Sequence, residues 1–158
     1  MTKPALLAQI IARLQAELVM LTAAALATHA EATDEENKAE DKYDTRGLEA
    51  SYLAHGQSKA AEDAALAVAQ FQALAPRDFA ADSPVSIGAL VVLEGHDRSH
   101  YFIGPRAGGT AVPHADHTVL VITPQSPLGR QLMGRRQGEV LQLELGTKRS
   151  AVRIALVS

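Results

Sequence analysis

The stretch LAQIIARLQAELVMLTAAA, from Leu7 to Ala25, decides the first half of the fold. Its apolar side chains recur at alternating spacings of four and three residues, as a coiled-coil seam requires. These positions are Leu7, Ile11, Leu14, Leu18, Leu21 and Ala25. Pro4 suits a first helical turn, and no proline or glycine follows before Gly47. We therefore predict one long helix from about residue 5 to about residue 30.

A second seam with the same spacing ends before Pro76. Its positions are Leu53, Gln57, Ala60, Ala64, Ala67, Phe71 and Leu74. The many alanines allow close approach to the bulkier first helix. We predict an antiparallel coiled-coil hairpin over residues 1–75, with a compact helical bundle as the alternative.

The segment between the two seams is strongly acidic. Seven of the 18 acidic residues lie between Glu31 and Asp44. At the tip of a hairpin, such carboxylates could present negative charge or oxygen ligands to a partner. The alternative is a solvated tip whose charge favours the start of the second helix.

The second half of the chain has a different pattern. Residues 76–84 contain two prolines and several polar residues, as a linker does. Short apolar or alternating segments at 89–93, 101–103, 118–122, 140–145 and 151–157 predict strands of an antiparallel sheet. Ser126 and Pro127 predict the start of one short helix over 126–136. The predicted class is α+β, with a globular domain over 85–158.

Composition narrows the class of protein. The chain has no cysteine, which excludes disulfides and thiolate metal sites. It shows no secretory leader pattern, and Arg13, Gln15 and Glu17 interrupt the first apolar helix. We therefore expect a cytoplasmic protein that does not cross a membrane. The net charge of −3 divides into −5 over residues 1–75, −1 over the linker and +3 over 85–158. The basic half could dock on an acidic surface, although ordinary surface charge would also explain it.

The string ITPQSPLGRQLMGRRQGEV, Ile122 to Val140, resembles the C-terminal signature of the Gre family of bacterial transcript cleavage factors. The shared features are the serine-proline-apolar start, the leucine before a glycine and the glycine-acid-valine exit. The helical hairpin, the boundary near residue 76 and the chain length also fit that family. The resemblance implies an FKBP-like globular domain.

The resemblance also implies a function. Gre factors dock at the secondary channel of RNA polymerase, and the acidic tip helps to hold a Mg²⁺ ion at the polymerase active site, which stimulates cleavage of backtracked RNA. A monomer of this kind would be no enzyme itself, would have no cofactor of its own, and would meet RNA and DNA only through the elongation complex. A Gre-like channel regulator without cleavage stimulation is the alternative.

The tip departs from the family pattern of an aspartate and a glutamate three positions apart. Aligning Glu36 and Asn37 with the family's glutamate-asparagine places Thr33 at the aspartate, whereas aligning Tyr43 with the family's tyrosine places Ala39 at the glutamate. Neither register keeps both carboxylates. We predict that Asp34, Glu35 and Glu36 act in trans, with Asp34 and Glu36 as the Mg²⁺ ligands. Glu40 and Asp41 are the reserve.

The resemblance assigns polymerase binding to six residues of the globular half: Ser126, Pro127, Leu128, Arg130, Arg135 and Arg136. A helix start alone would also explain the first three. His96, His100, His114 and His117 lie in loop-like sequence, and surface histidines are favoured over a metal enzyme. The low aromatic content of 4% disfavours an FKBP-type isomerase pocket.

Overall fold

The computed structural model describes residues 2–33 and 46–158. The chain divides into two compact units. One contains residues 1–13 and 69–158, and the other contains residues 14–68. The expected bounds of 1–75, 76–84 and 85–158 for hairpin, linker and globular domain stay a prediction.

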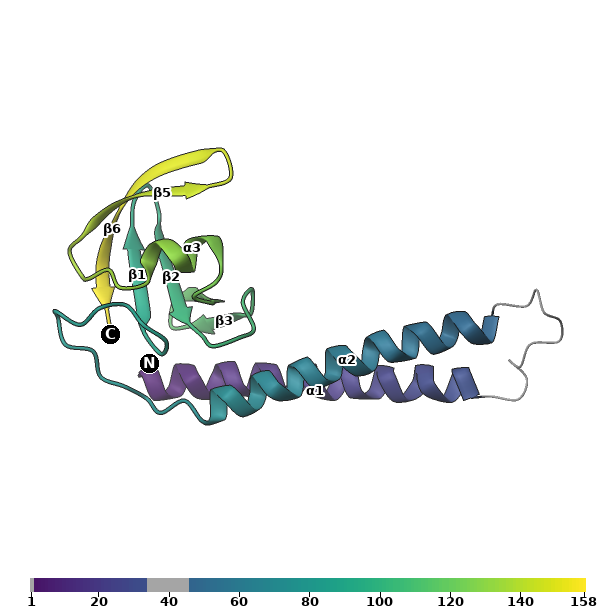
Figure 1. The fold of residues 1–158 in the computed structure, drawn as a ribbon. Helices are drawn as coiled ribbons and strands as arrows, with labels where there is room; N and C mark the ends of the chain where they lie inside the picture. The colour runs from purple at the N-terminus through teal and green to yellow at the C-terminus, as the bar shows by residue number, and fades with distance from the viewer. Residues whose placement is uncertain (1, 34–45) are drawn as a thin grey trace. The chain divides into compact units, whose positions relative to one another are not determined.

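Two long helices form the first half of the chain, as predicted. Helix α1 covers Lys3–Thr33 and helix α2 covers Arg46–Gln72, and both are drawn in Figure 1. Along α1, three predicted seam residues are buried, namely Leu7, Leu14 and Ala25, and the other three are half-buried. Leu6 and Ile10, which the predicted seam did not include, are fully buried. Along α2 the seam is shifted at its start, because Leu53 is exposed and Ala54 is buried. A methyl group therefore lies at the helix contact where leucine was expected.

Helix α1 is long and apolar enough to cross a membrane. Its segment Lys3–Glu31 has a mean hydropathy of 1.6 in its most apolar window, despite Arg13 and Glu17. Length and composition alone do not show that a helix crosses a membrane, so the expectation that the chain does not cross one stays a prediction. The same properties occur in a helix that pairs with another helix through an apolar face.

The second half is a six-stranded sheet with one short helix, which confirms the α+β class. The strands are β1 (Leu90–Glu94), β2 (Arg98–Ile103), β3 (Ala111–His114), β4 (His117–Ile122), β5 (Val140–Leu145) and β6 (Lys148–Val157). Their order in the sheet is β3-β4-β2-β1-β6-β5. The pairs are antiparallel apart from β2 with β4, so the sheet is mixed rather than purely antiparallel.

The parallel pair follows from strand β3, which the sequence analysis did not predict. After β2 the chain crosses to the sheet edge, forms β3, and returns as β4 between β3 and β2. Strand β3 is only four residues long and contains Pro113, which removes an amide donor. An edge position tolerates this loss.

The core lies on both faces of the central strand β1, whose first four residues are buried. On one face, Val91 and Leu93 pack in a cluster with Leu132 of helix α3 (Pro127–Leu132), which lies over the sheet in Figure 1. Elsewhere in the same unit, Phe71 is fully buried, with its ring centroid 6.2 Å from that of Phe102. Burial on both faces explains the unbroken apolar run of β1.

Candidate functional site

The acidic residues predicted to act in trans lie outside the described residues. These are Asp34, Glu35 and Glu36, with the reserve pair Glu40 and Asp41. The segment that carries them joins α1 to α2. Their role therefore stays a prediction from the sequence.

The part of the two-helix pair near this segment contains small buried side chains and a hydrogen bond between the helices. Ala25 of α1 and Ala54 of α2 are buried. The Thr28 hydroxyl donates to the amide oxygen of Gln57 across the pair at 2.7 Å. A polar group at a seam position favours one register of the two helices over its neighbours.

The short helix α3 begins at a well-formed cap. The Ser126 hydroxyl accepts a hydrogen bond from the Gly129 amide at 3.0 Å and donates to the Thr123 carbonyl at 2.8 Å. Pro127 occupies the first turn, where an amide hydrogen would lack a helical partner. Leu128 is buried in the core. The geometry of the helix start therefore accounts for Ser126, Pro127 and Leu128, and their role in binding a partner stays a prediction.

Gly129 fixes how closely α3 approaches the turn before it. A Cβ atom at this position would lie 1.9 Å from the Thr123 carbonyl oxygen and 2.9 Å from Ser126 Oγ. Glycine is required here by space rather than by a positive φ. The Gly129 in the family-like string is therefore part of the cap itself.

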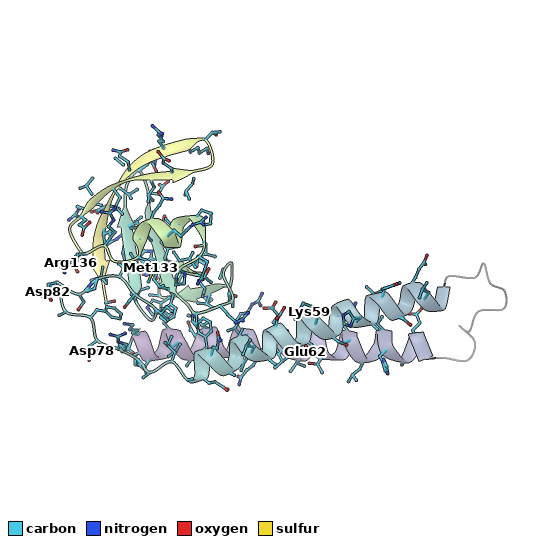
Figure 2. The ribbon with its side chains drawn as sticks, in the orientation of Figure 1. Lys59, Glu62, Asp78, Asp82, Met133 and Arg136 are labelled. Carbon is cyan, nitrogen blue, oxygen red and sulfur yellow. The ribbon has the colours of Figure 1, made fainter. Side chains whose placement is uncertain are left out.

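The chain leaves α3 through a turn that displays the arginines. Gly134 has φ +78°, which suits glycine, and its amide donates to the Val85 carbonyl at 2.9 Å. The Glu139 carboxylate accepts from the Arg136 amide at 2.9 Å and lies 3.4 Å from an Arg135 guanidinium nitrogen. Arg130, Arg135 and Arg136 are exposed. Figure 2 labels Met133 and Arg136 in this segment.

A hollow of about 600 Å³ opens between α3, this turn and strand β5. Its lining includes Arg130, Gln131, Met133, Gly134, Arg135, Glu139, Leu141 and Gln142. Two of the predicted binding arginines, Arg130 and Arg135, thus border one hollow. The sequence analysis missed Gln131 and Gln142, and the alternating pattern of 140–145 is the signal that could have placed Gln142 on an exposed side of a strand.

Three of the four histidines of the globular half come together at the end of the sheet formed by β2, β3 and β4. The His100 and His117 rings stack with centroids 3.7 Å apart, and the His114 ring lies 6.0 Å from that of His117. His114 is buried, contrary to the expected surface position, and its Nδ1 has no hydrogen-bond partner. Burial is the main cause that lowers the pKa of both His100 and His114. Among the described residues, no group of three or more histidines and carboxylates is placed to hold a metal ion.

Several solved structures are similar to this chain over nearly its whole length, and three of them illustrate the likeness. They are the structure of the transcription factor Gfh1 (21% identity, 94% of this chain and 93% of that one, TM-score 0.37), GreA factor homolog 1 (Gfh1) of Thermus thermophilus (18%, 94% and 94%, 0.40) and Gfh1 of Thermus aquaticus (17%, 92% and 91%, 0.38). No family model matches the chain, and no curated protein does. Identity and superposition are both low, so this likeness by itself assigns no function.

Proposed function

We propose that this protein is a Gre-like transcription factor that binds bacterial RNA polymerase at its secondary channel and stimulates cleavage of backtracked RNA. The observation that carries the proposal is the family-like string Ile122 to Val140. In the structure it spans the end of β4, the whole of α3 and the start of β5. In this segment Ser126 accepts the hydrogen bond that caps α3, and Gly129 allows the close approach of α3 to Thr123.

The two-helix pair with its acidic joining segment supports the same proposal. The sequence places seven carboxylates from Glu31 to Asp44, of which Glu31 belongs to the last turn of α1 and the other six lie between α1 and α2. Mg²⁺ prefers oxygen ligands and keeps several of its waters, so one or two carboxylates from a second protein can complete its coordination. In this proposal Asp34 and Glu36 supply those oxygens, and Glu35 adds negative charge beside them.

The protein is not itself an enzyme in this proposal. The Mg²⁺ ion belongs to the polymerase active site, where a second metal can activate water and stabilise the leaving oxygen. The factor has no cofactor of its own and contacts RNA and DNA only within the elongation complex. Its place of action would be the cytoplasm.

A second candidate function is a channel regulator that does not stimulate cleavage. The sequence observation that favours it is the spacing of the acidic residues, because neither alignment of the tip retains an aspartate and a glutamate three positions apart. Such a protein would occupy the same channel and modulate initiation or elongation.

A backtracked elongation complex tests the proposal and separates the two candidates. The purified protein should release a short 3′ RNA fragment in the presence of Mg²⁺. A triple variant, Asp34→Asn, Glu35→Gln and Glu36→Gln, should lose this release but still bind polymerase. A matched control, Glu62→Gln with Asp63→Asn, neutralises exposed carboxylates of α2 and should keep it; Figure 2 shows Glu62 on that helix.

The outcomes distinguish the candidates clearly. Polymerase binding without fragment release at any Mg²⁺ concentration supports the second function. No binding to polymerase rejects both. Equal release by the triple variant and the wild type would show that these three carboxylates do not act in the reaction.

A further inference from the structure

The hollow described above lies along the free edge of strand β5. Strand β5 is the last strand of the sheet and, among residues 2–33 and 46–158, pairs with β6 alone. One side of the hollow is formed by Leu141 and Gln142 of this strand, and the other by Arg130, Met133 and Arg135. A partner entering the hollow would therefore meet backbone as well as side chains.

The helix α3 already contacts this edge through a side chain. The Gln131 amide nitrogen donates to the Glu144 carbonyl at 2.9 Å, and the Glu144 amide donates to the Gln131 amide oxygen at 2.9 Å. This paired contact is the one that a peptide group of an added strand would make. It shows that the backbone of Glu144 faces outward, away from β6.

The alternation of an antiparallel ladder extends this orientation along β5. Every second residue directs its N–H and C=O to the same side, so Gln142 and Val140 face outward like Glu144. The inward bond at the start of the strand agrees, because the Ile154 amide donates to the Glu139 carbonyl at 2.9 Å. The outward backbone of Gln142 thus lies at the hollow.

The charge beside this edge selects the kind of peptide. Arg130, Arg135 and Arg136 are exposed on the side of α3 and the turn that follows it. Glu139 is the one carboxylate in that segment, and Arg135 pairs with it at 3.4 Å. Arginine side chains bind carboxylates through paired hydrogen bonds, so the surplus positive charge favours acidic side chains.

We propose that the hollow binds a short, extended, acidic peptide segment of a protein partner, which adds as a strand to β5 at Val140 and Gln142. Gln131 occupies the edge at Glu144 and so limits the added strand to about two or three residues in register, or roughly 7 to 10 Å. Backbone hydrogen bonds position the segment, and Arg130 and Arg135 select its acidic side chains.

This inference rests on the proposed function only for the identity of the protein that supplies the segment. The chemistry of the hollow is the same whichever protein carries it. Because the test uses free peptides, peptide binding and polymerase binding can fail independently of each other.

The test measures binding of fluorescein-labelled hexapeptides to the full chain by fluorescence anisotropy. The probe alternates glutamate and valine. One comparison peptide carries N-methyl groups at alternate residues, which remove backbone donors without changing charge, and another replaces glutamate by lysine. The glutamate peptide should bind at least about tenfold more tightly than either, a difference of about 1.4 kcal/mol. Amide resonances of Val140 and Gln142 should shift and become protected from exchange.

Two pairs of variants test whether the peptide binds in the hollow. Arg130→Gln with Arg135→Gln should weaken binding on the order of tenfold, whereas Arg106→Gln, at an exposed residue between β2 and β3, should not. Gln142→Pro removes the outward donor and should abolish binding, whereas Gln142→Ala keeps it.

Three results would overturn the proposal. Equal binding of the N-methylated peptide would reject strand addition, even if the proline variant failed to fold. Equal binding of the lysine peptide would reject selection by charge. Tighter binding of a single-stranded RNA oligonucleotide at the same arginines would assign the surface to nucleic acid instead.

Discussion

Replacing Gly129 by alanine should damage the start of α3, which carries the family-like string. The added Cβ would lie 1.9 Å from the Thr123 carbonyl oxygen, well inside the 3.0 Å below which real contacts essentially do not occur. The helix or the turn must therefore move by about 1 Å, a shift of the kind that overpacked sites require. Because Ser126 bonds both the Gly129 amide and the Thr123 carbonyl, this movement also breaks the cap.

The expected cost follows from these two effects. Overpacking costs about 1 to 3 kcal/mol and loss of a serine cap about 1 kcal/mol. We therefore expect Gly129→Ala to lower the free energy of unfolding by about 2 to 4 kcal/mol. Gly56 is the matched control, since nothing lies within 4 Å of a Cβ built there. In the middle of α2, Gly56→Ala should raise stability by about 0.5 to 1 kcal/mol.

Urea unfolding followed by far-ultraviolet circular dichroism gives the overall change. Because the chain divides into two compact units, backbone amide exchange should be read separately for β1 and for α2. Protection should fall in β1 for Gly129→Ala and rise in α2 for Gly56→Ala. Wild-type stability of Gly129→Ala would refute the close approach of α3 to Thr123.

Three further predictions concern packing and titration. Phe71→Ala should lower the free energy of unfolding by about 3 to 5 kcal/mol, measured by thermal unfolding, because the side chain is fully buried. Leu66→Ala, at a residue 42% exposed, should lower it by less than about 1 kcal/mol. Similar losses for the two variants would contradict the burial of Phe71. The pKa values of His100 and His114 are lowered in the folded chain, so the unfolded chain takes up protons at a higher pH than the folded chain does. The free energy of unfolding should therefore fall as pH drops below about 6.5. Urea midpoints measured against pH should show this slope and a flatter one for His114→Leu, and an equal slope for that variant would contradict the role of His114. Burial lowers the pKa of Lys3 to about 8, so acylation of its amine, measured by mass spectrometry, should be half-maximal near that pH rather than near the usual value of about 10.4.

The sequence predicted the elements whose pattern is local. The four-three spacing placed both long helices, and Ser126 with Pro127 placed the start of α3. The expected end of α3 at residue 136 was too late, because the helix ends at Leu132 and Gly134 takes a positive φ. Here the bonds between Gly134, Arg135 and Val85 replace further helical turns.

Features that depend on distant contacts could not be read from the sequence. Strand β3 is short and contains Pro113, so its pattern resembles a loop, and its position at the edge forces the parallel pairing of β2 with β4. The burial of His114 follows from the same arrangement. Likewise, the choice of Ala54 over Leu53 at the helix contact depends on the rotation of α2 about its axis rather than on local hydrophobicity.

The residues of the candidate site also fall into two groups, those that the sequence could indicate and those that only the fold shows. Resemblance could point to Arg130 and Arg135, but only the fold shows that they border one hollow with Gln142. Gln131 was not expected at all, since its role arises from pairing with the backbone of Glu144, which is 13 residues further along the chain.

Site-specific crosslinking tests the central claim most directly. A photoreactive benzoylphenylalanine replaces Asn37 in the acidic segment, and a control protein carries it at exposed Asp97 between β1 and β2. After irradiation with a backtracked RNA polymerase complex, we predict crosslinks from position 37 to polymerase peptides beside the catalytic Mg²⁺ ion and none there from position 97. Crosslinks from position 37 only to the outer surface of the polymerase, or none at all, would contradict the claim that this protein delivers its acidic segment to the active site.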